Sequence, residues 1–464
     1  MKVKKLLKDV SYTVFSNLVS LLISTVLVLV VPKFIGVEDY GYWQLYLFYT
    51  SYVGILHFGW LDGIYLRFGG KKYADLNEKL FFSQFIEFLI FQIILGICII
   101  LVSFLSGDSN RAYILVMTAC AMILINLRQF CLYILQDTGR MQEYAIATMV
   151  GRILYFVSVV ILLLLQESNF KLFIIADILG RVLSLAYALY SCKKIIFRKL
   201  CDFYFTFGEI WVNLSIGIKL LLANFAGTLI IGVVRYGIQK FWSVQVFGKI
   251  SLTLNISNLL MTFISAVGVV LYPTLRRTNK EKLRNVYSAI REILLNALFW
   301  GLLIYYPISI ILPIWLPKYN DSLIYMSLLF PMCIYSGKFS LLISTFMKTY
   351  RFEKDLLVVN LISVLFSVIL TILNVIVIKR LPVLMCSIIV ILWVQSSLGE
   401  YILGKKLKLR SFHKIWAETI VVIIFMSSSW YLGTFQSMTV YMITIVIYTI
   451  FNKNSLKRGI SYFH

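Results

Sequence analysis

Charged residues are scarce in this chain of 464 residues. They make up 14% of it, whereas about 25% is usual in a soluble domain. Hydrophobic residues reach 60%, well above the usual ~45–50%. A water-soluble fold could not bury this much apolar surface, but a lipid bilayer solvates it. The apolar runs have helical length and lack the alternation of a membrane β-strand, so the composition predicts an all-α polytopic membrane protein.

Residue types that commonly hold metals or perform catalysis are also few. The three His residues (His57, His413 and His464) lie far apart, and the seven Cys residues form no CxxC pair. The chain contains no P-loop, no GxSxG and no HExxH. These are the signatures of nucleotide, acyl-transfer and zinc-protease chemistry. We therefore expect no metal site, no cofactor and no enzymatic activity.

Fourteen apolar segments are near the ~20 residues that a helix needs to cross the hydrocarbon core, except the last, which is marginal. They are residues 10–31, 42–65, 80–105, 112–135, 144–165, 170–191, 210–233, 247–272, 290–315, 322–347, 355–378, 382–403, 416–434 and 437–451. The first follows a basic leader but lacks a small-x-small cleavage site, so we interpret it as a retained helix. The longest connection, around Arg276 to Arg291, is too short for a soluble domain.

Lysine and arginine are distributed asymmetrically between alternate connections. With the N-terminus inside, 30 of the 44 basic residues lie in inside segments, 9 in outside connections and 5 within spans. Basic residues mark cytoplasmic loops, so both termini are predicted to be cytoplasmic. The net charge of +23 then reflects topology and not nucleic-acid binding, because the basic clusters are short and carry no nucleic-acid motif.

One loop sequence occurs twice. KFIGVEDYG begins at Lys33 and KFWSVQVFG begins at Lys240, which is an offset of 207 residues. Six predicted spans separate the copies, so both lie outside and the two halves share one orientation. The chain is therefore predicted to contain two parallel six-helix repeats, residues 1–195 and 205–405, followed by two extra helices and a cytoplasmic tail in residues 412–464. A chance match of four identities in nine positions is the alternative.

The segment VPKFIGVEDYGYWQLY resembles a region of the polysaccharide-biosynthesis branch of the multidrug/oligosaccharidyl-lipid/polysaccharide (MOP) exporter superfamily. Members carry a similar pattern after helix one, here Pro32, Gly36, Tyr40 and Gly41, and an Arg after helix two, here Arg67. The resemblance implies a Wzx-type flippase of the bacterial cytoplasmic (inner) membrane. It would move an undecaprenyl-pyrophosphate-linked oligosaccharide (O-antigen, capsule or exopolysaccharide unit) outward by alternating access, and the partners would include a polysaccharide polymerase and chain-length machinery.

Charged residues at membrane depth are the candidate site. The basic ones are Arg128, Arg152, Arg181, Lys219 and Lys338, and the clear acidic ones are Glu87 and Asp177. Such residues are costly in lipid and should face the interior. Their balance predicts a positive lumen for a pyrophosphate, formed by Arg152, Arg181, Lys219, Lys338 and Arg67. Glu87 or Asp177 is a candidate for ion coupling.

Several of these charges also have a structural interpretation, whereas Arg152 and Lys219 each lie about two turns into a span and are harder to explain in this way. Asp177 and Arg181 are four residues apart and can neutralise one another. Arg128 and Lys338 can extend toward the membrane surface, and Glu87 can pair with a buried cation. Gly151 and Gly180 each precede an arginine, and small residues there would permit close approach of their helices.

Uncharged polar residues form stripes on two predicted helices. Asn255 and Asn258 belong to one stripe on the eighth, and Asn17 belongs to another on the first. Their helical spacing places them on one face. They line the cavity or hydrogen-bond between helices; the spacing fits both.

Three alternatives remain. A multidrug cation antiporter coupled to H⁺ or Na⁺ would need acidic residues in its cavity. A membrane glycosyltransferase or polysaccharide polymerase would need a long outside loop, which the chain lacks. A flippase for the peptidoglycan precursor would differ only in its sugar-contacting residues.

Overall fold

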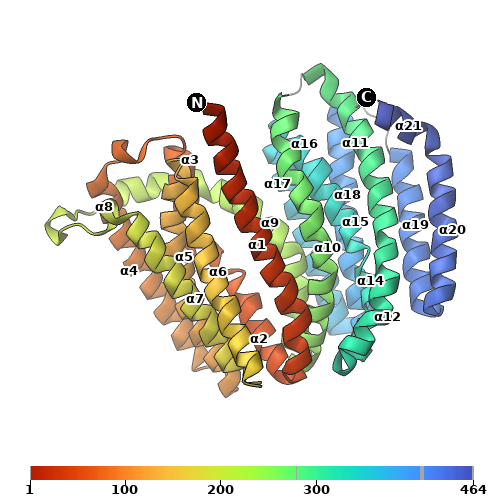
Figure 1. Ribbon diagram of the computed structural model, residues 1–464, viewed down its shortest axis with the longest axis horizontal. Helices are drawn as coiled ribbons and strands as arrows, with labels where there is room; N and C mark the ends of the chain where they lie inside the picture. Colours follow the sequence, from red (N-terminus) through yellow and green to blue (C-terminus); the bar gives the residue numbers. More distant parts are fainter. Residues whose placement is uncertain (1, 278–279, 408–411, 462–464) are drawn as a thin grey trace. The chain divides into compact units, whose positions relative to one another are not determined.

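The computed structural model describes residues 2–277, 280–407 and 412–461, with side chains at 16, 18–259, 261, 283–407 and 414–457. Nearly all of these residues are helical, and none of them lies in a β-strand (Figure 1). This confirms the predicted all-α class. The chain divides into two compact units, Met1–Phe225 and Ala226–His464. The predicted boundaries of the two repeats and of the C-terminal segment stay predictions.

The first unit contains the helices of the N-terminal part of the chain. They are α1 (Lys2–Phe34), α2 (Val37–Thr50), η1 (Val53–His57), α3 (Trp60–Phe68), η2 (Tyr73–Asp75), α4 (Glu78–Ser103), α5 (Ser109–Asp137), α6 (Met141–Leu164), α7 (Phe170–Ser191), α8 (Lys193–Ile196), η3 (Leu200–Asp202) and the first half of α9 (Phe207–Phe241).

The second unit takes the rest of α9 and the helices that follow. They are α10 (Val244–Arg277), α11 (Lys280–Gly301), η4 (Leu302–Ile304), α12 (Tyr305–Trp315), η5 (Pro317–Tyr319), α13 (Asn320–Leu323), α14 (Met326–Leu329), α15 (Met332–Gly337), η6 (Lys338–Ser344), α16 (Thr345–Thr349), α17 (Glu353–Leu373), η7 (Asn374–Ile378), α18 (Leu381–Leu407), α19 (Phe412–Tyr431), α20 (Thr434–Phe451) and α21 (Lys453–Ser461).

Within the described residues, ten helices are long and apolar enough to cross a membrane. The protein is therefore a multi-span helical membrane protein. The span windows differ in burial: 89% of the window in Met326–Thr349 is buried, against 22% of that in Met141–Leu164. The former is a central helix of its unit, and most of the latter's window is not buried within the described structure.

Polar side chains start three of the spans. Asn77 accepts a hydrogen bond from the backbone N–H of Leu80, Asp108 from those of Asn110 and Arg111, and Asn169 from that of Lys171. These N-caps satisfy backbone donors that have no partner within the helix. Each cap therefore fixes where the chain turns to re-enter the membrane.

The second predicted span is not one continuous helix, and that prediction is wrong. α2 ends at Thr50 and α3 begins only at Trp60, with η1 between them. Asn126 donates to the carbonyl of Val53, and Gln92 donates to that of Leu56. These amides supply partners for carbonyls that the interrupted helix leaves open, which is the condition for irregular backbone at membrane depth.

The duplicated loop sequence corresponds to a duplicated turn. α1 ends at Phe34 and α2 begins at Val37; α9 ends at Phe241 and α10 begins at Val244. Both pairs of boundaries differ by the 207 residues that separate the two loop sequences. The sequence match therefore marks the same helix–turn–helix junction in each half of the chain.

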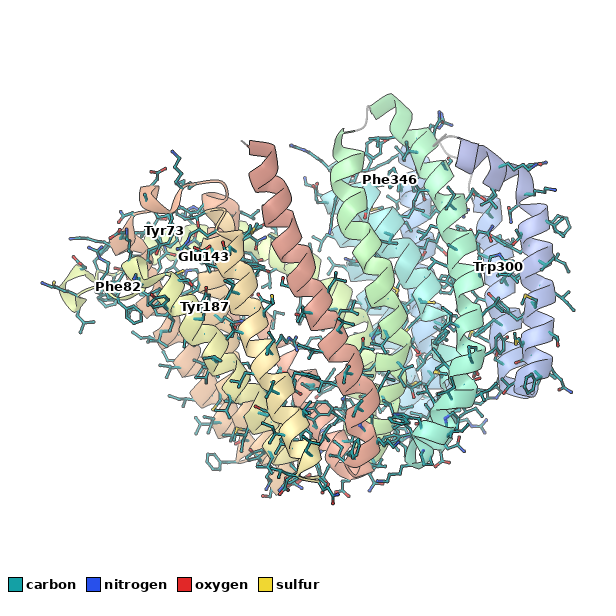
Figure 2. All side chains as sticks on the ribbon, in the orientation of Figure 1. Tyr73, Phe82, Glu143, Tyr187, Trp300 and Phe346 are labelled. Atoms are coloured by element: carbon teal, nitrogen blue, oxygen red, sulfur yellow. The ribbon has the colours of Figure 1, made fainter. Side chains whose placement is uncertain are left out.

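The C-terminal helices are joined to α11 by polar contacts. Trp300, labelled in Figure 2, donates its indole hydrogen to the hydroxyl of Thr449 on α20 at 3.3 Å. Tyr441 of α20 donates to the carbonyl of Phe299 at 2.8 Å. These bonds fix α20 beside α11 within the second unit.

Candidate functional site

α6 and α7 touch backbone to backbone at two glycines. A Cβ added to Gly151 would lie 2.6 Å from the carbonyl oxygen of Gly180, and a Cβ on Gly180 would lie 2.6 Å from that of Gly151. No larger residue fits either position without displacing the other helix. The predicted close approach is confirmed. It brings Arg152 and Arg181, the residues that follow these glycines, to one helix crossing.

A third arginine reaches this crossing from α5. Arg128 donates through Nη1 to the hydroxyl of Ser184 at 3.1 Å, and that hydroxyl donates to the carbonyl of Ala147 at 2.5 Å. The Arg128 Nε is buried and has no hydrogen-bond partner among the described residues. Its guanidinium is therefore held in place through Nη1, while its buried Nε–H is an unused hydrogen-bond donor.

Arg181 is partly neutralised. Its Nε lies 2.5 Å from Oδ2 of Asp177 one turn earlier, and the same oxygen accepts a hydrogen bond from the hydroxyl of Tyr46 at 2.7 Å. This confirms the predicted pairing of Asp177 with Arg181. The Tyr46 hydroxyl of α2 fixes the carboxylate further.

We call Arg128, Arg152 and Arg181 the three-arginine cluster. Arg128 lies within electrostatic reach of both other arginines and of Asp177. Arg152 is exposed and forms no ion pair among the described side chains. Because Asp177 is the one carboxylate that pairs with the cluster in the described part of the chain, the cluster keeps excess positive charge.

Arg67 binds the first half of α9. It donates through Nη1 to Oδ1 of Asn213 at 2.6 Å, and its Nη2 lies 2.7 Å from Oε2 of Glu209. Asn213 in turn donates to Gln84 of α4 at 2.9 Å. The structure thus places Arg67 in a contact between α3 and α9, apart from the three-arginine cluster. Lys219, further along α9, is exposed.

Glu87 is occupied by the segment that leads into α9. Its carboxylate accepts hydrogen bonds from the backbone N–H of Thr206, at 2.8 Å, and from the Thr206 hydroxyl. The same segment is tied to α4 by Arg198 with Glu78 and by Lys79 with Asp202, the latter at 2.9 Å. Within the described residues Glu87 has no cationic partner; it holds the start of α9.

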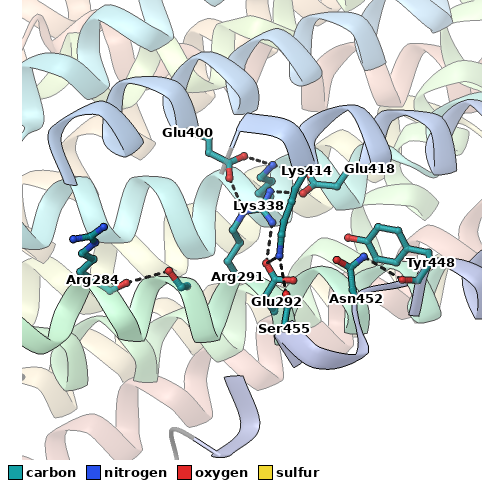
Figure 3. A network of polar contacts seen from close by, with 11 residues as sticks. Arg284, Arg291, Glu292, Lys338, Glu400, Lys414, Glu418, Tyr448, Asn452 and Ser455 are labelled. Atoms are coloured by element: carbon teal, nitrogen blue, oxygen red, sulfur yellow. Dashed lines mark hydrogen bonds and ion pairs between the residues drawn. The ribbon is translucent and has the colours of Figure 1, made fainter. Parts of the chain in front are cut away.

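Lys338 lies in a buried charge network of the second unit (Figure 3). Its Nζ contacts Glu400 of α18 and Glu418 of α19, and the same two carboxylates contact Arg291 of α11. Each of the four side chains is at most 2% exposed. Lys338 is therefore not extended toward the membrane surface, and its charge is neutralised.

Arg291 was predicted to end a connection, and Glu400 and Glu418 were not among the predicted site residues. The structure instead makes them the core of this network, and the segment from Arg276 to Arg291 is mostly helical within the described residues. Glu292, Lys414 and Ser455 extend the network toward α21 (Figure 3). One feature of the sequence could have indicated this network, namely Glu400 inside the apolar run of α18.

The remaining predicted polar residues lie on α1 and α10. Asn255 is half-buried and Asn258 is exposed, and each has an interaction partner. The side chain of Asn17 lies outside the described residues. Within those residues, no group of three or more His, Cys, Asp or Glu side chains is placed to hold a metal ion.

Sequence comparison finds no matching protein-family model and no matching curated protein. Comparison of structures does find proteins of similar fold. The lipid II flippase MurJ in an inward closed conformation has a TM-score of 0.65 and 15% identity, covering 97% of this chain and 99% of that one. An inward-facing multidrug resistance MATE family transporter of the MOP superfamily has a TM-score of 0.63 and 14% identity, covering 87% and 99%.

A third structure carries a description of its binding pocket. It is a MOP superfamily transporter from Pyrococcus furiosus, described as having reversed polarity of its binding pocket, with a TM-score of 0.52, 15% identity and coverage of 89% and 96%. At such low identity these likenesses establish architecture and leave the substrate open. This chain has the fold of the MOP superfamily transporters.

Proposed function

We propose that this protein is a flippase for an undecaprenyl-pyrophosphate-linked oligosaccharide, which it moves from the inner to the outer leaflet of a bacterial cytoplasmic membrane. The observation that carries the proposal is the three-arginine cluster, which keeps excess positive charge at the junction of α5, α6 and α7. A pyrophosphate leaving water needs cations and hydrogen-bond donors to replace its hydration. The fold shared with the lipid II flippase supports the same substrate class.

The individual arginines suit an anionic ligand in different ways. Arg128 has a buried Nε without a partner, and Arg152 has an exposed guanidinium without a counter-charge among the described side chains. Guanidinium groups bind phosphate oxygens through paired N–H donors. Arg181 is already paired with Asp177 and would contribute orientation more than charge.

The two acidic residues predicted at membrane depth, Asp177 and Glu87, argue against a cation as substrate. Asp177 is bound by Arg181 and Tyr46, and Glu87 is bound by Thr206. A drug cation would have to displace these partners. An anion moving outward is instead favoured by a membrane potential that is negative inside, by about 2.3 kcal/mol per charge per 100 mV.

The test is leaflet-resolved translocation of an undecaprenyl-pyrophosphate-linked sugar in inverted membrane vesicles. We expect Arg152→Gln to slow translocation by roughly tenfold, which corresponds to about 1.4 kcal/mol of lost charge-assisted binding. Arg380→Gln is the matched control, because Arg380 is exposed outside the cluster and undergoes the same charge change.

Two outcomes would overturn the proposal. If Arg152→Gln inserts normally and translocates like the Arg380→Gln control, the cluster does not bind the substrate. If the wild-type protein moves no glycolipid but exchanges an organic cation for H⁺ or Na⁺, the antiporter alternative holds.

A translocated glycolipid would be available on the outer leaflet to a polysaccharide polymerase and chain-length machinery.

A further inference from the structure

His57 ends η1 at the break between α2 and α3. The next two residues have left-handed backbone conformations, with φ of 50° at Phe58 and 90° at Gly59. His57 is 6% exposed and Asp62, one turn into α3, is 3% exposed. A titratable ring is therefore buried at the point where the helix is interrupted.

Hydrogen bonding fixes the tautomer of this ring. The backbone N–H of Gly59 donates to Nδ1 of His57 at 3.1 Å. A neutral imidazole that accepts at Nδ1 carries its proton on Nε2. Nε2 lies 3.7 Å from Oδ2 of Asp62, whose other oxygen lies 3.5 Å from the hydroxyl of Tyr133 on α5.

The break also supports α9. A Cβ added to Gly217 would lie 1.9 Å from the carbonyl oxygen of Gly59 and 2.4 Å from the backbone nitrogen of Gly63. A Cβ on Gly59 would lie 2.5 Å from the backbone nitrogen of Ile218. The first half of α9 therefore rests directly on the backbone that the His57–Gly59 hydrogen bond holds.

We propose that His57 is a proton-binding site. Its protonation opens the break between α2 and α3 and loosens the contact of this break with the first half of α9. Nδ1 cannot carry a proton and also accept the Gly59 N–H. Protonation would leave that buried donor without its acceptor, a state that native structures avoid. The break must then rearrange to give the N–H another partner.

Asp62 supplies the counter-charge for the protonated ring. Other titratable or charged groups on the surrounding elements include Tyr65 and Arg67 on α3, Glu87 on α4, Arg128, Tyr133 and Asp137 on α5, and Glu209 and Lys219 on α9. Glu87 is bound by Thr206 and Glu209 by Arg67. Among the described side chains, Asp62, with Oδ2 at 3.7 Å from Nε2, is the one carboxylate within ion-pair distance of the ring. A neighbouring carboxylate favours the protonated imidazole.

This inference does not depend on the substrate, because hydrogen exchange can test it without transport. The full-length protein in lipid nanodiscs would be labelled between about pH 8 and about pH 4, a range that extends below the ordinary titration of histidine because burial disfavours the charged ring. Rates would be corrected for the intrinsic pH dependence of exchange. We expect peptides covering residues 52–63 and 213–220 to lose protection on acidification, by roughly tenfold or more, while peptides of α18 keep theirs.

His57→Asn is the decisive variant, because its amide oxygen can accept the Gly59 N–H but cannot be protonated in this range. We expect it to remain protected throughout. Asp62→Asn should move the wild-type transition to lower pH, because the counter-charge is lost. The proposal is overturned if wild-type protection is independent of pH, or if His57→Asn loses protection as the wild type does.

Discussion

Lys338 of η6 donates a hydrogen bond to Glu418 of α19 across 2.6 Å, and both side chains are 2% exposed. The two residues are 80 positions apart. With Arg291 and Glu400 they form a closed set of two cations and two carboxylates (Figure 3). Such a set is stable only when complete, because each remaining charge would otherwise be buried without compensation.

Removing one member of this set should be costly. We expect Arg291→Met to lower the free energy of unfolding by about 3–5 kcal/mol, since Glu400 and Glu418 would then share a single cation. Denaturant-induced unfolding in detergent micelles measures the change. The double variant Arg291→Met/Glu418→Met removes one charge of each sign and should recover much of the loss. A stable single variant would contradict the compensation argument.

The glycine contact between α6 and α7 predicts that an added methyl group lowers stability at Gly180 but not at Gly301. Gly180→Ala places a Cβ 2.6 Å from the carbonyl oxygen of Gly151. We expect overpacking to destabilise the first unit by about 1–3 kcal/mol. Gly301→Ala is the control, because a Cβ there meets nothing within 4 Å, and alanine is the better helix former. Thermal unfolding measures the stability of both variants. Equal stabilities of Gly180→Ala and Gly301→Ala would contradict the close contact between α6 and α7.

Glu87 should tolerate loss of its charge better than loss of its oxygens. Gln at this position can still accept from the Thr206 N–H, whereas Leu cannot. A hydrogen bond to a charged group contributes about 1.5–3 kcal/mol, so we expect Glu87→Leu to expose residues 203–210 to protease and Glu87→Gln to do so less. If Glu87→Gln abolishes ion-coupled transport while leaving proteolysis unchanged, Glu87 couples ions instead of anchoring α9.

The contact of Lys79 with Asp202 gives the linker before α9 a predictable acid sensitivity. The hydrogen bond from Lys79 lowers the pKa of the Asp202 carboxyl. A carboxyl with a lowered folded pKa contributes stability that is present above its ordinary value of about 3.9 and is lost as the pH falls through the folded value. Limited proteolysis at residues 197–206 should therefore be constant from neutral pH to about pH 5 and rise below about pH 4.

Asp202→Asn separates this effect from the titration of other carboxyls. The variant should be cleaved at these residues even at neutral pH, with a weaker dependence on acid. Equal acid sensitivity in the variant and the wild type would mean that another group controls the linker. Lys79→Gln should have a smaller effect than Asp202→Asn, because Arg198 still pairs with Asp202 at 3.1 Å.

Local sequence features predicted several details of the fold and site correctly. The spacing of Asp177 and Arg181 predicted their ion pair, because residues four apart on a helix lie side by side. Gly151 and Gly180 predicted the close approach of α6 and α7. The two loop copies predicted equivalent junctions, because the same short sequence ends one helix and starts the next in both halves of the chain.

The interrupted second span was not predictable from its composition. Residues 42–65 are apolar and aromatic enough to read as one helix. The break depends on Gln92 and Asn126, which come from α4 and α5 to satisfy its carbonyls. It also depends on contact between Gly59 and α9. The helix propensity of residues 42–65 does not depend on the partners that other helices supply, so it could not predict the break.

The sequence by itself determined the class of this protein, because burying so many apolar residues requires lipid and the basic residues mark alternate connections. It also determined the contacts that span a single helical turn. Only the tertiary structure decided which membrane-depth charges are neutralised. Lys338 and Arg291 find their carboxylates 62 to 127 positions away, and residues so distant in sequence meet only when helices pack. The same packing leaves Arg152 exposed and without a described counter-charge at the crossing of α6 and α7.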